Sequence, residues 1–270
     1  MKKIFALLIA LLMMATLVAC SNDDTGNPLE TMGIDDNNYS NNTIGSFTYD
    51  VSADGHYEIT GYLVNEKTEH KVEIPSEIDD IAVTGIAAEA FKSCTSITEV
   101  TVPSSVKYIG EFAFYDCDKL KTVTIADSVE TIGTGAFRGC DVLNNVKLPA
   151  ALTVVSEQLF WECASLSKIT FGAKTAVIGT GAFYNCDALT AITLPSTITE
   201  IQETAFYGCD KLVSITVPAS VTKVANTAFA NINAEEVTFN AAKDSYFVKF
   251  FEENYGINEK DYSHYVINVK

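Results

Sequence analysis

Six cysteines recur every 23 residues through the middle of this 270-residue sequence, and a thiol can serve as a nucleophile, a metal ligand or a disulfide partner. They are Cys94, Cys117, Cys140, Cys163, Cys186 and Cys209. Metal sites usually show closely spaced pairs such as C-x-x-C with histidines nearby, and this spacing shows neither. Nucleophilic catalysis needs a base beside the thiol, but the three histidines lie outside the run of cysteines, at His56, His70 and His264. The spacing therefore indicates a structural role.

The carboxylates offer no better arrangement for catalysis. Three pairs are adjacent in the sequence, so their side chains diverge and should be solvated: Asp79 with Asp80, Glu235 with Glu236, and Glu252 with Glu253. The sequence also contains no glycine-rich phosphate loop, P-loop or calcium loop. We therefore predict a protein that is not an enzyme, with no catalytic residues, no bound metal and no cofactor.

A 23-residue repeat surrounds each cysteine. A phenylalanine stands three residues before every cysteine and continues into a seventh copy, at Phe91, Phe114, Phe137, Phe160, Phe183, Phe206 and Phe229. Alanine precedes each of them except Phe160, which follows Leu159, and Ile232 takes the cysteine position in the seventh copy. Seven copies in one register predict an array of stacked repeats.

Each repeat changes its hydrophobic period midway. An apolar–polar–apolar triplet such as Val100-Thr101-Val102 predicts a short strand with one buried face, and Pro103 suits the end of that strand. Ala, Phe and Cys at positions −1, 0 and +3 would share one side of a single helical turn. The sequence thus predicts a solenoid whose coils stack their strands into a parallel sheet, because no coil can bury its apolar face alone.

The body cysteines fit the core of such a solenoid better than they fit disulfides. Equivalent positions on adjacent coils have parallel Cβ vectors about 4.8 Å or more apart, whereas a disulfide needs about 3.8 Å between Cβ atoms. Ile232 in the same position supports apolar packing, in which cysteine behaves as a small hydrophobe. We expect six free thiols stacked in the core, although an exported protein would meet conditions that favour disulfides.

The repeat resembles a known family. The pattern A-F-x-x-C-x-x-L-x-x-I-x-x-P-x-x-V-x-x-I-G, over roughly residues 70–240, is similar to the BspA-like class of leucine-rich repeat. The resemblance implies an α/β leucine-rich repeat solenoid that is right-handed, with a parallel β-sheet on the concave side and short helical or extended turns on the other. It also implies a cell-surface role in adhesion to host proteins, host cells or other microbes.

Both ends of the array depart from the repeat. Residues 47–75 alternate around Asp54-Gly55, which predicts a β-hairpin cap, and the stretch from Ile74 to Ile86 matches the repeat with about five inserted residues. At the other end, aromatic residues at helical spacing predict a helical cap: Tyr246, Phe247, Phe250, Phe251 and Tyr255. We expect these caps to cover the first and last coils.

The N-terminus carries an export signal. Lys2 and Lys3 precede an apolar run that ends in Leu17-Val18-Ala19-Cys20 and is followed by polar residues. The end of this run resembles a bacterial lipobox, which implies a diacylglyceryl group on Cys20; an ordinary secretory signal is the alternative. The expected organisation is a signal peptide (1–19), a flexible tether (20–46), the solenoid with its N-terminal β cap (47–240) and a C-terminal cap (241–270).

The charge balance limits the partners. The net charge is −17, and no Lys or Arg occurs between Lys3 and Lys67, so a basic patch for nucleic acid or an anionic bilayer is not expected. No apolar run long enough for a transmembrane helix follows the N-terminal segment. We therefore expect an extracellular protein at the outer membrane or cell surface, held to the membrane only by its N-terminal lipid.

Two rows of side chains are candidates for binding. The residue after each repeat phenylalanine lies opposite the buried positions on a helical wheel of about 100° per residue. This row reads Lys92, Tyr115, Arg138, Trp161, Tyr184, Tyr207 and Ala230, and its members from Tyr115 to Tyr207 are the candidate partner-binding residues. The alternative role of these side chains is to shield the edges of the hydrophobic core between neighbouring coils. The outward-facing strand positions form the second row: Thr101, Thr124, Lys147, Thr170, Thr193 and Thr216. Threonine also has a high propensity for β-strands, which is a structural explanation for this row.

With catalysis and nucleic-acid binding not expected, these features leave recognition of a binding partner as the expected function. The leading hypothesis is a non-enzymatic, lipid-anchored surface protein that mediates protein–protein or cell adhesion, with a host or microbial surface protein as partner. The alternative is a glycan-binding surface lipoprotein involved in polysaccharide capture, in which the aromatic residues would stack on sugar rings. A purely structural envelope protein is a third hypothesis.

Overall fold

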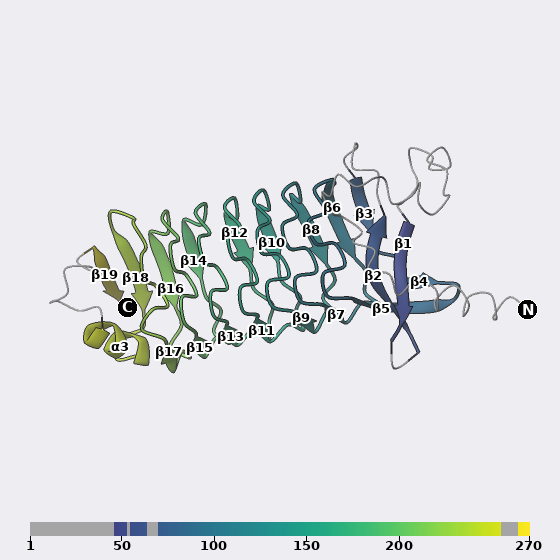
Figure 1. The fold of residues 1–270 in the computed structure, drawn as a ribbon. Coiled ribbons are helices and arrows are strands. Elements are labelled where there is room, and N and C mark those ends of the chain that lie inside the picture. The colour runs from purple at the N-terminus through teal and green to yellow at the C-terminus, as the bar shows by residue number, and fades with distance from the viewer. Residues whose placement is uncertain (1–45, 53–54, 64–69, 255–263) are drawn as a thin grey trace, which may run out of the picture.

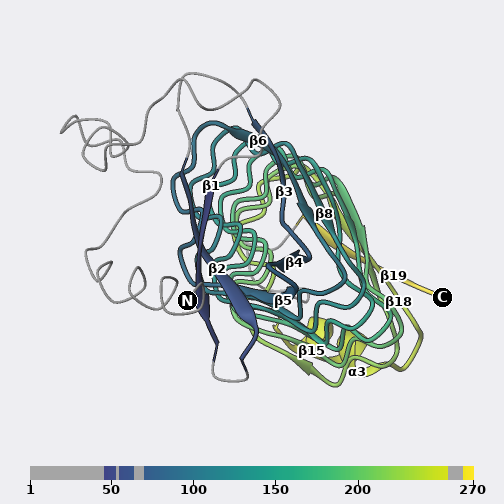
Figure 2. The same ribbon diagram turned by 90° about the vertical axis from the view of Figure 1, so that its right-hand side faces the viewer.

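The computed structural model describes residues 46–52, 55–63, 70–254 and 264–270. Over this part the chain winds into a parallel β-solenoid of about eight coils spaced by about 23 residues (Figure 1). Viewed from its N-terminal end, the coils superpose on one another as closed outlines (Figure 2). The predicted signal peptide and nearly all of the tether, including Cys20, lie outside the described residues.

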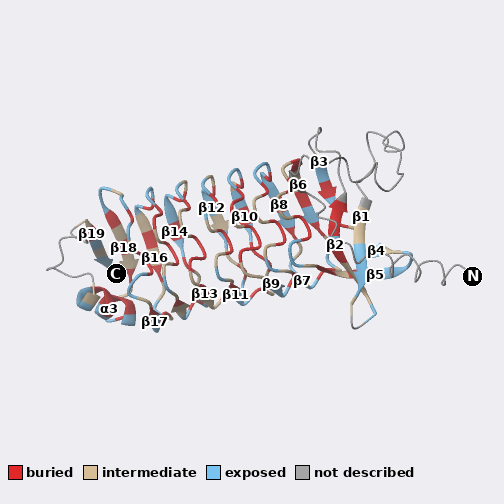
Figure 3. Ribbon diagram, in the orientation of Figure 1, coloured by how far each residue is buried: buried red, intermediate tan, exposed pale blue. Residues whose placement is uncertain are grey.

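The first side of each coil is a strand built on the apolar–polar–apolar triplet. These strands pair in parallel and in register, as in Val100 with Val123, and we call them the first sheet. One hydrogen-bonded ladder contains β3 (His70–Glu73), β6 (Ile97–Val102), β8 (Thr122–Ile125), β10 (Asn145–Lys147) and β12 (Lys168–Thr170). A second ladder continues the same side of the solenoid with β14 (Ala191–Thr193), β16 (Ser214–Val217), β18 (Val237–Ala241) and β19 (Tyr265–Val269). Buried residues alternate with exposed or half-buried ones along most of them, as in β8 (Figure 3). The predicted strands are therefore confirmed.

A second parallel sheet, which the sequence analysis did not predict, forms the next side of the coil. Most of its strands are only two residues long, with one buried residue such as Ile178. One hydrogen-bonded ladder contains β5 (Ile81–Ile86), β7 (Tyr108–Ile109) and β9 (Thr131–Ile132). A second ladder continues the same side with β11 (Val154–Val155), β13 (Val177–Ile178), β15 (Glu200–Ile201) and β17 (Lys223–Val224). A single apolar residue in each repeat is too short a pattern to indicate a strand.

The third side of the coil consists of tight turns around the repeat phenylalanine, and we call it the turn ladder. The residues two places before and after the phenylalanine mostly have positive φ, for example 59° at Gly181 and 54° at Asn185 on either side of Phe183. The N–H groups of Gly181, Phe183 and Asn185 donate to carbonyl oxygens of the next coil at 2.8–2.9 Å. The residues between them donate within their own turn, as Tyr184 does to Gly181.

The turn ladder differs from the single helical turn that the Ala, Phe and Cys spacing predicts. A helical turn directs all its N–H groups back into its own segment. In the observed turns, positive-φ residues stand two places before and two places after the phenylalanine, and the N–H groups of these residues and of the phenylalanine point along the solenoid axis. This arrangement satisfies the main chain by bonds between coils rather than within them.

The repeat phenylalanines stack face to face through the core. From Phe91 to Phe229, neighbouring ring centroids are 4.8–5.9 Å apart and the interplanar angle does not exceed 21°. All seven rings are fully buried. Offset-stacked aromatic pairs add about 0.5–1.5 kcal/mol each beyond burial, so this column contributes strongly to the association of neighbouring coils.

The cysteine position lies beside the phenylalanine column. The thiol of Cys186 donates a hydrogen bond to the carbonyl oxygen of Phe160, with an Sγ–O distance of 3.2 Å, and four others make the same contact with the coil before them at 3.0–3.1 Å: Cys117, Cys140, Cys163 and Cys209. These five cysteines are free and buried, which confirms their predicted packing role. Cys94 is equally buried but disulfide-bonded, so the expected number of free thiols is corrected from six to five. Cys94 belongs to the first copy, which no phenylalanine turn precedes.

Two hairpins occupy the N-terminal end. Strands β1 (Ser46–Val51) and β2 (Tyr57–Leu63) pair antiparallel, and β2 pairs in parallel with β5 of the second sheet. The inserted residues before Ile86 form the other hairpin, in which β4 (Glu77–Ile78) pairs antiparallel with β5. Asp79 and Asp80, expected only to be solvated, have φ of 49° and 65° and form its tight turn. Asp54 lies outside the described residues.

The C-terminal end combines a helix and a strand. Helix α3 (Tyr246–Asn254) buries Phe247, Val248, Phe250 and Phe251 and packs against β17 and β19, and it is not long and apolar enough to cross a membrane. Strand β19 then pairs in parallel with β18, and the hydroxyl of Tyr265 donates to the carbonyl oxygen of Phe229. The sequence predicted the helix but not β19, because Tyr265–Val269 carries no phenylalanine–cysteine turn. Tyr255 lies outside the described residues.

We expect the five free thiols to be unreactive in the folded protein and to react once it unfolds. Burial raises the pKa of the Cys209 thiol to about 12 and that of Cys186 well above its ordinary value, so almost no thiolate forms at mildly alkaline pH. Titration with a coloured disulfide reagent, before and after addition of guanidinium chloride, measures this. Rapid reaction of the folded protein would contradict the packing of these cysteines.

The phenylalanine column should dominate the stability of the solenoid. We expect Phe183→Ala to lower the free energy of unfolding by about 3–5 kcal/mol, because it removes a fully buried ring that stacks on two others. The control Thr193→Ala changes an exposed residue on the first sheet and should stay within about 0.5 kcal/mol. Urea denaturation followed by circular dichroism gives both values, and equal shifts would refute the role of the column.

Candidate interaction surface

The residues that follow the repeat phenylalanines form a continuous row on the turn ladder. We call Lys92, Tyr115, Arg138, Trp161, Tyr184 and Tyr207 the aromatic row; the short side chain of Ala230 ends it. Their side chains are half-buried, while the adjacent phenylalanines are fully buried. The carbonyl oxygen of Tyr184 accepts the N–H of Glu162 at 2.8 Å, and every member from Tyr115 to Tyr207 is bonded in this way to the coil before it. The coil spacing therefore sets the distance between neighbouring side chains.

The members of the aromatic row stack on one another along the solenoid axis. The rings of Trp161 and Tyr184 are almost parallel, with centroids 3.7 Å apart, and those of Tyr184 and Tyr207 are 4.8 Å apart. The guanidinium carbon of Arg138 lies 5.1 Å from the Trp161 ring and 5.7 Å from the Tyr115 ring. Lys92 approaches the Tyr115 ring at 5.8 Å. Cation–π contacts and ring stacking thus join all six residues.

This stacking covers the faces of the central rings. Trp161 lies between Arg138 and Tyr184, and Tyr184 lies between Trp161 and Tyr207. The half-buried side chains therefore present mainly their edges to solvent, while Nε1 of Trp161 and Nε of Arg138 are buried without a hydrogen-bond partner among the described residues. Such a surface makes edge contacts and hydrogen bonds with a partner, whereas a sugar ring that stacks on an aromatic residue needs an open face.

Gly181 makes room for Trp161. It has a φ of 59°, and a Cβ atom placed on it would lie 2.8 Å from Cε3 of Trp161. An alanine at this position would therefore combine a strained backbone with a steric clash. The large ring of one coil and the glycine of the next are coupled, which the sequence analysis did not detect because the two residues are not neighbours in the repeat pattern.

A groove of about 320 Å³ on the same side of the solenoid is lined mainly by carboxylates, and we call it the acidic groove. Its lining includes Asp116, Asp118, Asp141, Glu162 and Asp187. Carboxylates that are adjacent in the sequence do not indicate this groove, because its lining comes from four successive coils. The available signal was the residue directly after the repeat cysteine, which is aspartate in four copies: Asp118, Asp141, Asp187 and Asp210.

Burial and mutual repulsion perturb the carboxyl groups of the acidic groove. Burial raises the pKa of Asp141, and the charges of Asp118 and Asp116 raise it further. The pKa of Asp187 is raised by burial and then by Asp210. The groove therefore carries negative charge that favours cationic groups and repels anionic ones. Within the described ranges, no cluster of three or more His, Cys, Asp or Glu side chains is arranged to hold a metal ion.

The second candidate row lies on the outer face of the first sheet. Thr101, Thr124, Lys147, Thr170 and Thr193 are exposed, and Thr216 is half-buried. Lys147 forms an exposed ion pair with Asp127 at 3.0 Å, which contributes little in water. This face is polar and carries short side chains, so it offers a partner no large apolar anchor.

The groups able to perform chemistry are not brought together. His56 and His70 lie at the N-terminal end, whereas His264 lies at the C-terminal end with Nε2 2.9 Å from the carbonyl oxygen of Ile232. The five free thiols are buried inside the solenoid. In the part of the chain that the structure describes, no thiol and histidine form a nucleophile–base pair.

Comparisons with known proteins agree with this architecture. The family model described as "BspA type Leucine rich repeat region (6 copies)" matches residues 64–190 and 176–270. A leucine-rich repeat protein from T. pallidum, known from its crystal structure, is 30% identical, with a TM-score of 0.59 over 73% of this chain and 84% of that chain. A leucine rich cell surface protein from Faecalibacterium prausnitzii is 24% identical, with a TM-score of 0.42 over 73% of this chain and 75% of that chain. No curated protein matches the sequence.

The family match covers both the repeats and the C-terminal end, and the similarity to the T. pallidum protein extends over most of both chains. Both agree with the 23-residue register and the parallel sheets of the structure. The chain therefore belongs to the BspA-type leucine-rich repeat family.

Proposed function

We propose that this protein is a non-enzymatic surface lipoprotein that mediates protein–protein or cell adhesion through its leucine-rich repeat surface. The observation that carries the proposal is the aromatic row. Tyr, Trp and Arg are the residue types most enriched at interface hot spots, and here they follow one another over five coils from Tyr115 to Tyr207. Leucine-rich repeat proteins are generally scaffolds for interaction rather than enzymes, which agrees with this role.

The aromatic row suits binding because it is already ordered. Each ring from Tyr115 to Tyr184 is held by rings or cations on both sides of it, as Trp161 is by Arg138 and Tyr184. A partner that contacts these side chains therefore does not have to immobilise them, which lowers the entropic cost of association. The acidic groove on the same side favours a partner surface with basic groups. A host or microbial surface protein is the partner that these features fit best.

The alternative, a glycan-binding lipoprotein for polysaccharide capture, depends on aromatic faces that are open to sugar rings. The faces of Trp161 and Tyr184 are covered by their neighbours in the row. This geometry favours a protein partner over a glycan at the aromatic row.

Truncation of the two central rings should weaken adhesion. We expect Trp161→Ala combined with Tyr184→Ala to reduce binding to extracellular-matrix proteins or microbial cells at least tenfold, because loss of hot-spot side chains costs about 2 kcal/mol or more. Binding is measured on a panel of immobilised matrix proteins, on microbial cells and on a glycan array.

The matched control is Thr170→Ala combined with Thr193→Ala, which alters the exposed face of the first sheet instead. Circular dichroism verifies that both double variants keep the solenoid. Unchanged binding to every protein and cell tested would remove the aromatic row from the proposal. Selective loss of glycan binding would favour the alternative function.

We also propose that Cys20 anchors the protein at the outer membrane or cell surface, on its extracellular side. The lipobox-like residues before Cys20 and the polar residues after it support this. Each buried CH₂ of an acyl chain contributes about 0.8 kcal/mol, so two or more chains hold a protein stably at a bilayer.

Mass spectrometry of the N-terminal peptide from the membrane fraction should find a diacylglyceryl group on Cys20. Five of the seven cysteines are free and Cys94 is disulfide-bonded, so Cys20 is the one cysteine of the chain left to pair with Cys94. Lipidation and that disulfide exclude each other, so a Cys20 peptide that is unmodified or linked by a disulfide would contradict the anchor. Cys20→Ala should abolish acylation of the N-terminal segment, while protease treatment of intact cells reports whether the anchored body faces outward.

A further inference from the structure

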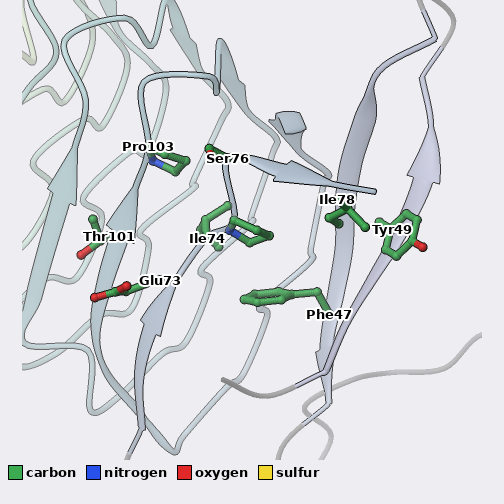
Figure 4. A pocket seen from close by; sticks show the side chains of 9 residues that line it. Phe47, Tyr49, Glu73, Ile74, Ser76, Ile78, Thr101 and Pro103 are labelled. Carbon is green, nitrogen blue, oxygen red and sulfur yellow. The ribbon is translucent and has the colours of Figure 1, made fainter. Parts of the chain in front are cut away.

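A cavity of about 600 Å³ opens at the N-terminal end of the solenoid, between β1 and the carboxyl end of β3 (Figure 4). Phe47 and Tyr49 of β1 line one side of it, while Ile74, which follows β3, lies across from them. Pro75 also belongs to the lining. Ile78 of β4 adds a further apolar side chain. Tyr49 is 43% exposed. An apolar cavity of this size at the end of a repeat array is a surface that protein normally covers.

The N-terminal cap covers the two sheets unequally. The β1–β2 hairpin adds two strands to the second sheet ahead of β5. The first sheet instead ends at β3, which pairs with β6 on one side and with no described strand on the other. At the C-terminal end, β19 extends the first sheet and α3 packs against the last strand of the second. The edge of β3, next to the cavity, is therefore left without a capping strand among the described residues.

The main chain of β3 directs hydrogen-bonding groups toward this edge. The N–H groups of His70 and Ile74 donate to Ser96 and Thr101, on the side of β6, at 2.8 and 3.0 Å. Alternate residues of a strand direct their main-chain groups to the same side, so the N–H and C=O groups of Lys71 and Glu73 point away from β6. Among the described residues, none forms a hydrogen bond with them on that side. These groups can pair with an added strand.

We propose that residues 28–34 of this chain add to the edge of β3 as a strand and fill the cavity with their apolar side chains. The segment reads Pro28-Leu29-Glu30-Thr31-Met32-Gly33-Ile34, in which Met32 and Ile34 lie on the same side of an extended strand. By contrast, the eleven residues that join it to β1 include only Tyr39 and Ile44 as apolar side chains larger than glycine.

The position of this segment in the chain makes it a suitable occupant. Residues 35–45 span up to about 36 Å when extended, and they lead into β1, whose residue Phe47 itself lines the cavity. The segment can therefore return to the edge of β3 without any change in the cap. A segment tethered over so short a distance is present at an effective concentration in the millimolar range, which an external peptide would have to exceed.

Docking would shorten the spacer between the membrane and the body. If Cys20 is lipidated as proposed above, only residues 20–27 would remain free, and these span at most about 27 Å. The N-terminal end of the solenoid would then stay close to the bilayer. The docking itself does not depend on lipidation, and it is tested below on lipid-free protein, so that failure of one proposal leaves the other intact.

Amide hydrogen exchange measured by NMR tests the proposal on the mature chain carrying Cys20→Ser. The amides of Lys71 and Glu73 should exchange at least tenfold more slowly than in a variant that combines Leu29→Ser, Met32→Ser and Ile34→Ser. The amide of Val72 points toward β6 and should be protected in both proteins, which provides an internal control.

A second variant, Tyr39→Ser combined with Ile44→Ser, removes apolar side chains from the connecting residues and should keep Lys71 and Glu73 protected. Loss of protection in this variant as well would refute the assignment to residues 28–34. Fast exchange of Lys71 and Glu73 in the parent protein would mean that the edge is open and would overturn the proposal.

Slow exchange that persists in the triple serine variant would also overturn it, because another strand would then cover the edge. Protection that increases with protein concentration would identify a second copy of the chain as that strand. Protection that is independent of concentration would point to a different segment of the same chain.

Discussion

Each coil of this solenoid depends on hydrogen bonds that its turns make to the next coil. In the turn around Phe183, positive φ angles on both sides direct alternate N–H groups along the axis, where the N–H of Phe183 meets the carbonyl oxygen of Ala205 at 2.8 Å. These groups would lack protein partners in an isolated coil. The thiol of Cys186 adds a further bond to the carbonyl oxygen of Phe160. A single repeat is therefore incomplete both in its polar groups and in its apolar surface.

Because the coils are stacked in register, each side chain lies next to the equivalent side chain of the following coil. Phe183 consequently stacks on rings in both neighbouring coils, and Cys186 lies near Cys163 and Cys209 of those coils. On the outer side, Tyr184 stacks on Trp161 and Tyr207 by the same translation. One spacing thus organises both the buried core and the exposed row, which makes the exposed row as ordered as the core that supports it.

This order determines what kind of recognition the surface supports. Aromatic rings that stack on one another gain rigidity but lose open faces, so they suit contacts through edges, hydroxyl groups and the nearby acidic groove. The two ends of the solenoid differ from the middle, because the stack of repeating coils ends there. The hairpin β1–β2, the helix α3 and strand β19 supply the contacts that a further coil would have supplied, and the edge of β3 is where the described residues leave this replacement incomplete.

The sequence by itself determined the repeat, the strands of the first sheet, the burial of Phe183 and Cys186, and the outward row that contains Trp161 and Tyr184. Seven copies of one pattern make these features predictable, because a residue type that recurs at one repeat position indicates whether that position is buried or exposed. Only the tertiary structure decided the left-handed turns, the two-residue strands such as β13, the pairing of β19 with β18, and the groove formed by Asp118 and Asp141. It also decided that the faces of Trp161 and Tyr184 are covered. All of these depend on contacts between residues in different coils, and a local pattern of residue types does not encode the distance or direction of such contacts.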